Sequence, residues 1–302
     1  MPFIKLGSSV HCMTTPSAGT YAPATYLVGN GGEAIDAVRA SGFSTVVIWT
    51  IHVWPDGSFH FTDPPIVQDG EWVGDTTWPG LYSRIKQAPS SVDRLLFCVG
   101  SADAGDFGNI GELIKLHGTG SDTELYRNFA ALRQAIPEID GIDFDDEEGV
   151  DPATIVPLAQ MLHEIGYEVT FCPYAEQDTW IECLKTLNDT TPGAVTGFNL
   201  QCYAGGGGND PRQWAEAVSA AIPGFDSTAF VSPGEWSSPS GTCDDVLCPS
   251  QVESSFADWK SPEITSGWIW RFDYVEQCAG SGACPEGAAP ADYVKAITTG
   301  LS

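Results

Sequence analysis

Residues 138–151 read EIDGIDFDDEEGVD and carry eight acidic side chains in fourteen positions. Within this acidic segment, an isoleucine and a phenylalanine alternate with Asp143, Asp145 and Glu147. Because successive side chains of a β-strand point to opposite faces, the alternation predicts a strand with the three carboxylates on one face and the apolar residues on the other. A solvated run of charges does not require apolar residues at alternating positions. We therefore expect these carboxylates to line the interior of the fold.

Short apolar runs recur on both sides of the acidic segment, with helical patterns between them, which is typical of an α/β fold with a parallel sheet. Strands are predicted at 4–9, 45–51, 94–99, 141–145, 168–171, 197–203, 229–232 and 267–272. Helices are predicted at 33–40, 81–87, 123–135, 152–165, 178–187, 212–221, 250–260 and 291–299. Eight strand–helix pairs predict one (β/α)8 TIM barrel domain over residues 1–302, with the acidic segment on its fourth strand.

The ends of the predicted helices agree with this assignment. Asp151-Pro152 and Asp210-Pro211 each place a capping residue before a proline at the first helical position, and Gly166 ends the intervening helix. A doubly wound open sheet is the alternative fold. It would carry a G-x-G-x-x-G turn after its first strand, where residues 7–11 read GSSVH.

Two segments are too long for ordinary βα loops. Residues 53–73 contain Asp56-Gly57 and Asp69-Gly70, so we expect one or two hairpins over the barrel mouth. Their aromatic side chains either contact a ligand or pack within the hairpin, and the alternating pattern favours packing; these residues are Trp54, Phe59, Phe61 and Trp72. A second insertion is predicted at 233–249, after the seventh strand.

The chain has 302 residues, with 13 Lys or Arg against 40 Asp or Glu, so its formal net charge is −27. This excess of acid disfavours binding to a phosphate backbone or to an anionic lipid surface. The sequence contains no run of 18 apolar residues, the length expected of a membrane-spanning helix. We therefore expect neither nucleic acid nor a membrane as a partner, and we expect a monomer.

Nine cysteines are an odd number, so at least one thiol is unpaired within the chain. Cys243/Cys248 and Cys278/Cys284 are two close pairs in loop-like segments, where we expect local disulfides. Three others lie in apolar strand-like runs and are predicted to be buried thiols; they are Cys98, Cys172 and Cys202. Disulfides indicate an oxidising compartment, so we expect a secreted protein whose signal is absent from this chain. The alternative is a cytosolic protein with free thiols.

Other types of site do not fit the acidic segment. An EF-hand loop that began at Asp143 would need glycine at position 6 and glutamate at position 12, where Glu148 and Thr154 stand. None of the five histidines forms a His-x-x-x-His pair or adjoins the segment. The chain carries no G-x-S-x-G elbow and no Walker loop. We therefore predict carboxylate acid/base chemistry, with no metal and no cofactor.

The three carboxylates differ in their expected tasks. Crowded carboxyl groups cannot all ionise easily, so a proton held among them persists to a higher pH than on a lone carboxyl. Glu147 lies nearest the carboxyl end of the strand and is the best candidate for a general acid. Asp145 lies two residues deeper on the same face, and Asp143 is expected to hold or exchange a proton with Asp145.

Residues 140–147, DGIDFDDE, resemble the D-x-x-D-x-D-x-E signature of glycoside hydrolase family 18, the family of chitinases and endo-β-N-acetylglucosaminidases. The ending FDDE is most similar to the endo-β-N-acetylglucosaminidases of the Endo H type. Gln201-Cys202-Tyr203 on the sixth strand is similar to the Q-x-Y of plant-type chitinases. Trp268-Ile269-Trp270 on the eighth is similar to the strand whose tryptophan floors the sugar subsite. The family fold is a (β/α)8 barrel with the signature on strand four.

This resemblance implies a retaining endo-glycosidase in which the acetamide oxygen of the substrate attacks the anomeric carbon and forms an oxazolinium ion. Glu147 would protonate the glycosidic oxygen and then activate water, and Asp145 would orient the acetamide. Tyr203 would hydrogen-bond the acetamide oxygen, and Trp270 would stack under the sugar. The remaining candidates for substrate binding are Gln201, Trp49 and Asp140. The implied partner is an N-acetylglucosamine-containing glycan or glycoprotein.

The sequence departs from the family pattern at two places. The S-x-G-G of strand three is CVGS at residues 98–101, and strand six lacks the aspartate of the M-x-Y-D found in many chitinases. About 35 residues separate the last two predicted strands, too few for the extra domain of processive chitinases, so we expect an open cleft. Two other functions remain: a glycan-binding lectin on a decayed hydrolase barrel, and a related barrel that acts on another amide-bearing or sugar substrate.

Overall fold

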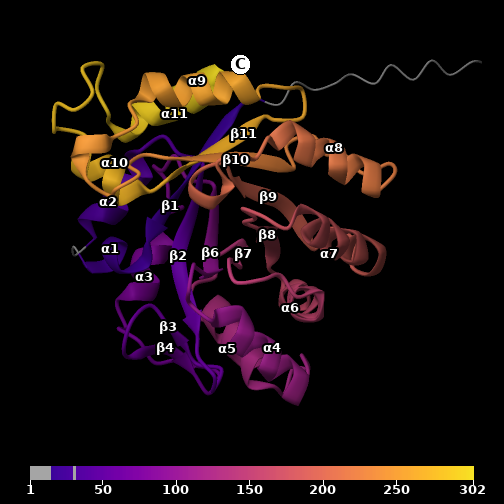
Figure 1. The fold of residues 1–302 in the computed structure, drawn as a ribbon. Coiled ribbons are helices and arrows are strands. Elements are labelled where there is room, and N and C mark those ends of the chain that lie inside the picture. Colours follow the sequence, from indigo (N-terminus) through magenta and orange to yellow (C-terminus); the bar gives the residue numbers. More distant parts are fainter. Residues whose placement is uncertain (1–14, 30–31) are drawn as a thin grey trace, which may run out of the picture.

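A computed structural model describes residues 15–29 and 32–302 of the chain. Eight parallel strands form a closed barrel at its centre, which confirms the predicted (β/α)8 fold (Figure 1). The ring closes because β1 pairs with both β2 and β11. In chain order the barrel strands are β1 (Ser17–Pro23), β2 (Thr45–Val53), β6 (Arg94–Gly100), β7 (Gly141–Asp145), β8 (Glu168–Phe171), β9 (Val195–Gln201), β10 (Val231–Trp236) and β11 (Ser266–Trp270).

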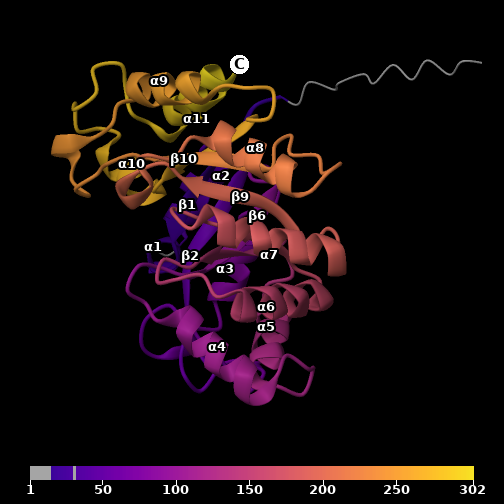
Figure 2. The same cartoon turned by 45° about the vertical axis from the view of Figure 1, so that its right-hand side comes forward.

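Helices cover the outer face of the barrel. In Figures 1 and 2, α4 to α8 follow one another along one side, and α9 lies beside α11 in both views. In chain order the helices are α1 (Ala24–Gly29), α2 (Glu33–Ala40), α3 (Trp78–Arg84), α4 (Asp106–His117), α5 (Glu124–Ala135), α6 (Pro152–Ile165), α7 (Gln177–Thr190), α8 (Pro211–Ala221), α9 (Pro249–Trp259), α10 (Phe272–Cys278) and α11 (Pro290–Leu301). No helix within the described ranges is long and apolar enough to cross a membrane.

The first barrel strand differs from the prediction. The strand predicted at 4–9 lies outside the described residues, and β1 has the sequence SAGTYAP, which is not an apolar run. A glycine at position 19 allows β2 to approach closely, because a Cβ there would lie only 3.3 Å from the carbonyl oxygen of Thr45 on β2. The other seven predicted strands each overlap a barrel strand.

All eight predicted helices overlap observed ones, and the helix at 152–165 has the predicted ends. The side chains of Asp151 and Asp210 cap α6 and α8, and Gly166 ends α6 in the left-handed conformation with φ 102°. The sequence pattern did not indicate α4, whose two internal glycines lower its helix propensity. One of them, Gly111, lies against Thr154 of α6, so the glycine permits close packing of the two helices.

The predicted hairpins form, but they do not lie over the barrel mouth. β3 (Phe59–His60), β4 (Pro65–Gln68) and β5 (Glu71–Trp72) continue antiparallel from β2 and pack beside α5 (Figure 1). The Phe59 ring lies 4.5 Å from that of Phe129 on α5, and Phe61 is buried against Tyr82 and Phe97. These two aromatic side chains therefore serve packing rather than ligand contact.

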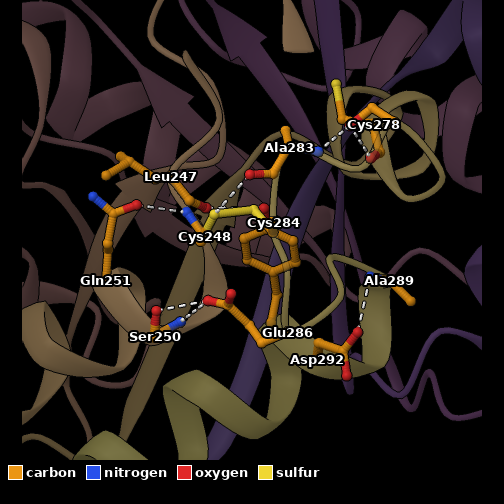
Figure 3. The surroundings of a disulfide bond; sticks show 12 residues. Leu247, Cys248, Ser250, Gln251, Cys278, Ala283, Cys284, Glu286, Ala289 and Asp292 are labelled. Atoms are coloured by element: carbon orange, nitrogen blue, oxygen red, sulfur yellow. Dashed lines mark hydrogen bonds between the residues drawn. A yellow bond between two sulfur atoms is a disulfide. The ribbon is translucent and has the colours of Figure 1, made fainter. Parts of the chain in front are cut away.

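The disulfides pair differently from the prediction. Cys243 bonds to Cys278 and Cys248 bonds to Cys284, so both join the segment after β10 to the segment after β11. Figure 3 shows the second bond, beside which Glu286 accepts a hydrogen bond from the Ser250 hydroxyl. The predicted local pairs are wrong because loops distant in sequence are adjacent at the barrel rim. Buried thiols are confirmed for Cys98, Cys172 and Cys202.

We expect removal of either crosslink to destabilise the fold. The loops that they close span 35 and 36 residues, and closing a loop of this length contributes about 2–4 kcal/mol by restricting the unfolded chain. The double substitution Cys243→Ser/Cys278→Ser should lower the free energy of unfolding by this amount, measured by denaturant titration. The single substitution Cys183→Ser, which removes a buried free thiol, serves as the comparison. Peptide mapping without reduction would contradict the connectivity if it found Cys243 joined to Cys248.

Candidate active site

A cavity of about 300 Å³ opens at the carboxyl ends of the barrel strands, where the active sites of such barrels lie. We call it the upper cavity. Six of the eight candidate residues line it: Trp49, Asp145, Glu147, Gln201, Tyr203 and Trp270. A larger groove of about 600 Å³ lies outside the barrel between α4 and α6, and none of these six residues lines it.

Gln201 joins the two carboxylates of the upper cavity. Its side-chain Nε2 donates to Asp145 Oδ1 and to Glu147 Oε1, at 3.1 Å in each case. β7 ends at Asp145, and Gln201 is the last residue of β9, two strands away. A buried amide that donates to both carboxylates fixes their separation. The half-buried Glu147 side chain still borders the cavity. No pattern in the sequence indicated this bridge.

Asp145 is 3% exposed, and its environment opposes ionisation. Burial, followed by the neighbouring charges of Glu147 and Asp143, raises the pKa of Asp145 well above its usual value. This is the behaviour expected of crowded carboxylates, in which one proton is shared by the group. A protonated Asp145 can donate a hydrogen bond, whereas an ionised one can only accept.

Asp143 lies one layer deeper than the upper cavity and is completely buried. Its carboxylate accepts hydrogen bonds from Tyr21 Oη at 2.6 Å, from Asn199 Nδ2 at 2.9 Å and from the Thr170 hydroxyl. Burial raises its pKa to about 6, although these three donors act in the opposite direction. Asp143 is therefore placed behind Asp145, as the alternation predicts, and acts on a ligand only through it.

The raised pKa of Asp143 makes the stability of the fold depend on pH. Between about pH 4, where an unfolded aspartate titrates, and about pH 6, the folded state holds more protons at Asp143 than the unfolded state does. The contribution of Asp143 to the free energy of unfolding should therefore fall as the pH rises through this window. Denaturant titrations should show Asp143→Asn gaining stability relative to the wild type from pH 4 to pH 6. A difference that stays constant across the window would contradict the assignment.

Aromatic side chains form the walls of the upper cavity. The rings of Trp49 and Trp270 meet edge to face at 5.0 Å, and Tyr203 stacks on Trp236 at 5.5 Å. Flat aromatic surfaces beside a few polar groups are typical of carbohydrate-sized ligand sites. Trp236 was not among the sequence candidates, because the predicted strand ended at 232 and the tryptophan was assigned to the following insertion.

That insertion supplies another wall. Ser238, Pro239, Ser240 and Gly241 border the upper cavity together with Tyr274 of α10. The Asp245 carboxylate holds this turn by accepting from Ser238 Oγ at 3.0 Å and from Ser240 N at 2.8 Å. Both disulfides join the same two segments, so they brace this side of the cavity.

Asp140 is not part of the site. It stands before β7, at the opposite end of the strand from Glu147, where Lys86 Nζ lies 2.6 Å from Oδ2. The same carboxylate oxygen accepts from the backbone N–H of Leu95 at 2.8 Å. Asp140 therefore joins β6 and the segment that follows α3 to the base of β7, and we correct its assignment as a substrate-binding residue.

Gly100, in the segment that departs from the family pattern, has a role that the sequence did not reveal. It pairs with Asp145 across β6 and β7 and has φ +99°. A Cβ at this position would overlap the carbonyl oxygen of Asp145. The glycine therefore permits the close approach of β6 to the strand end that carries the carboxylates.

We expect Gly100→Ala to destabilise the fold by about 2 kcal/mol or more, because both the positive φ and the overlap with backbone must be relieved. Gly108→Ala provides the control, since it lies within α4 and a Cβ there would have no contact within 4 Å. That substitution should be neutral or stabilising. Thermal or denaturant unfolding of both variants checks the prediction, and equal stability of the two would contradict it.

The geometry of the donor side chains does not favour metal coordination. Among residues 15–29 and 32–302, no group of three or more His, Cys, Asp and Glu side chains is arranged to hold a metal ion. The chemistry that the upper cavity offers is that of its carboxylates, its amide and its tyrosine and serine hydroxyl groups.

Comparison with known proteins shows the fold but not a family. No protein-family model matches the sequence, and no curated protein matches it significantly. Solved structures do match. Chitinase ChiC from Aspergillus fumigatus is 18% identical, with a TM-score of 0.58 over 85% of this chain and 91% of that one. YKL-39, solved in the presence of chitooligosaccharides (GlcNAc4), is 10% identical, with a TM-score of 0.63 over 95% and 99%.

A third structure is a chitinase from Bacteroides thetaiotaomicron, 10% identical, with a TM-score of 0.57 over 95% of this chain and 97% of that one. At such identities the shared property is the barrel fold, since one fold hosts many functions. Function must be argued from the site.

Proposed function

We propose that this protein is a family 18 glycoside hydrolase that cleaves β-1,4 linkages in N-acetylglucosamine-containing glycans with retention of configuration. The observation that carries the proposal is the bridge from Gln201 to Asp145 and Glu147 in an aromatic-walled cavity at the carboxyl end of the barrel. The family signature at residues 140–147 and the chitinase-like solved structures support the same conclusion.

In this proposal Glu147 is the general acid and base. It is half-buried at the cavity wall, so it has access both to the glycosidic oxygen of a bound glycan and to water. It protonates the leaving oxygen while the acetamide oxygen of the substrate attacks the anomeric carbon. It then removes a proton from the water that opens the resulting oxazolinium ion, which regenerates the acid and retains the configuration.

Asp145 and Tyr203 bind the acetamide in this proposal. Asp145 faces the same cavity as Glu147. When the shared proton rests on Asp143, the Asp145 carboxylate accepts from the acetamide N–H, directs the acetamide oxygen toward the anomeric carbon and stabilises the positive charge of the oxazolinium ion. Tyr203 keeps its hydroxyl proton, because burial raises its pKa well above the usual value, so it donates to the acetamide oxygen. Trp270 and Trp49 provide the stacking surface for the sugar.

The proposed substrate is a neutral glycan cut at an internal linkage. The connection between β10 and β11 contains α9 and no added domain, which favours an open cleft and endo action. A neutral glycan suffers no repulsion from a chain of net charge −27. We place the protein outside the cell, because two disulfides are typical of oxidising compartments, and we propose one catalytic domain.

The test is a panel of high-mannose and complex glycopeptides and chitin oligomers, incubated with the protein and read by mass spectrometry. Cleavage between the two core N-acetylglucosamines would establish an endo-β-N-acetylglucosaminidase, and shortened chitin oligomers would establish a chitinase. Binding without cleavage of any member would instead favour the lectin alternative. Cleavage confined to a sugar that lacks the acetamide would contradict the proposed mechanism.

A further inference from the structure

A second cavity, of about 310 Å³, opens at the opposite end of the barrel from the upper cavity. We call it the lower cavity. Barrel interiors at this level are usually filled by bulky Val, Ile and Leu side chains. Here the strands contribute small residues that leave the space unfilled, and serine and threonine hydroxyl groups line it together with apolar side chains; the small residues are Gly19, Thr45, Gly197, Ser232 and Ser266.

The lower cavity reaches the hydrogen-bond partners of Asp143. Tyr21, Thr170 and Asn199 all line it, and these are the three side chains that donate to the Asp143 carboxylate. Asp145, two residues further along β7, lines the upper cavity. The two aspartates therefore stand between the cavities, one connected to each.

The lower cavity is suited to water. Its serine, threonine and asparagine side chains offer water molecules several hydrogen-bond partners, and its volume has ample room for them. Arg94 stands at its edge, where its guanidinium donates to Thr196 Oγ1 at 2.7 Å and to Glu168 Oε2 at 3.0 Å, with about a third of its side chain exposed. The Thr170 hydroxyl can both donate and accept, so it can relay a proton between Asp143 and water.

We propose that the lower cavity is a water-filled shaft through which Asp143 exchanges its proton with solvent while a glycan occupies the upper cavity. This inference rests on the proposed function. Only O–H bonds change in the exchange: the proton leaves the Asp143 carboxyl through Thr170 to cavity water, and bulk water replaces it by the same route. The proton shared with Asp145 then stays in equilibrium with the medium during turnover.

The other titratable groups around Asp143 do not supply this proton. Burial raises the pKa values of Tyr21, Cys98 and Cys172, so all three remain neutral near neutral pH. The charge of Arg94 acts on Asp143 from the edge of the lower cavity and favours the carboxylate. Asp145 is the group with which the proton is shared.

Filling the lower cavity tests the proposal. Ser232 pairs with Asn199 across β9 and β10, so Ser232→Ile places an apolar side chain beside the partner of Asp143. Excluding water there should raise the pKa of Asp143 by about one unit. We then compare Ser232→Ile with the double variant Ser232→Ile/Asp143→Asn. The pH window in which the added Asp143→Asn substitution increases stability should move upward by the same amount. Ser232→Ala removes the hydroxyl without filling the space and should keep the wild-type window.

This readout needs no catalysis, so it separates the two proposals. In the active enzyme, the alkaline limb of kcat against pH should move in the same direction in Ser232→Ile. If Ser232→Ile kept both the wild-type pH window of the stability gain and the wild-type alkaline limb of kcat, the proposed shaft would be overturned. If the window moved in a protein that cleaves no glycan, the result would count only against the proposed function. Ser266→Ile fills the same cavity from β11 if the first variant does not fold.

A crystal structure of the unaltered protein provides a measurement that needs no variant. It should show hydrogen-bonded water from Thr170 to Arg94 along the lower cavity. A dry cavity, or one closed by side chains before it reaches Thr170, would overturn the proposal.

Discussion

Glu147→Gln should lower kcat for hydrolysis of a chitobioside or glycopeptide by at least about 10²-fold, because an amide cannot protonate the glycosidic oxygen. The amide oxygen of glutamine can still accept the hydrogen bond that Glu147 Oε1 receives from Gln201, so the cavity should keep its shape. Glycan binding should therefore persist. Initial rates measure the first effect, and isothermal titration calorimetry measures the second.

Glu148→Gln is the matched control for this substitution. Glu148 is the next residue along the chain, is exposed and does not line the upper cavity. Its Oε1 accepts from the backbone N–H of Gly105 at 2.8 Å, an interaction that glutamine preserves. The control should hydrolyse at the wild-type rate. Full activity in Glu147→Gln, or an equal loss in both variants, would remove Glu147 from its proposed role.

Asp145→Ala should lower kcat by about 10²–10³-fold on substrates that carry an N-acetyl group, the range lost when a preorganised electrostatic partner is removed. The physical reason is that the acetamide loses the carboxylate that orients it and stabilises the oxazolinium ion. A preformed oxazoline substrate has already completed this ring closure, so the variant should lose less on that substrate. Rates on the two substrates, measured side by side, give the comparison.

An Asp140→Asn variant distinguishes this effect from the mere loss of one negative charge in the acidic segment. Asp140 lies at the other end of β7 with Lys86, so its substitution should leave the rate unchanged at a temperature where the protein is folded. An equal loss by Asp145→Ala on both substrates would indicate collapse of the cavity rather than loss of an acetamide partner.

The sequence predicted those strands and helices whose local residue pattern matches their position in the barrel. β7 has the predicted bounds, because the alternation of carboxylates with Ile142 and Phe144 reflects a strand that faces the barrel interior on one side and the helices on the other. α6 likewise has its predicted ends, since the Asp151 cap and Gly166 are local signals.

Features that depend on the approach of distant segments were not predictable in this way. The first barrel strand is not an apolar run, and its Gly19 meets a close approach of β2 that no local pattern indicates. The disulfides cross between two loops whose proximity only the closed barrel creates, so spacing favoured the wrong partners. Asp140 shares the signature of the acidic segment, but it stands at the far end of the strand from the cavity.

The same distinction, between local patterns and contacts of distant segments, applies to the candidate site. Alternation placed Asp145 and Glu147 on one face, and the structure brings both to the upper cavity. The Gln201 bridge, the Tyr203–Trp236 stack and the opening behind Asp143 require strands that are separated in sequence. No pattern within a single strand could indicate them.

The proposed mechanism depends on participation of the substrate acetamide, which the ratio of two hydrolysis rates measures. Two chitobiosides with the same leaving group are compared, one carrying N-acetyl groups and the other N-trifluoroacetyl groups, whose fluorines withdraw electrons from the attacking oxygen. We expect the trifluoroacetyl substrate to react slower by about two orders of magnitude, because a neighbouring nucleophile contributes strongly to the rate. Equal rates for the two substrates would contradict the mechanism.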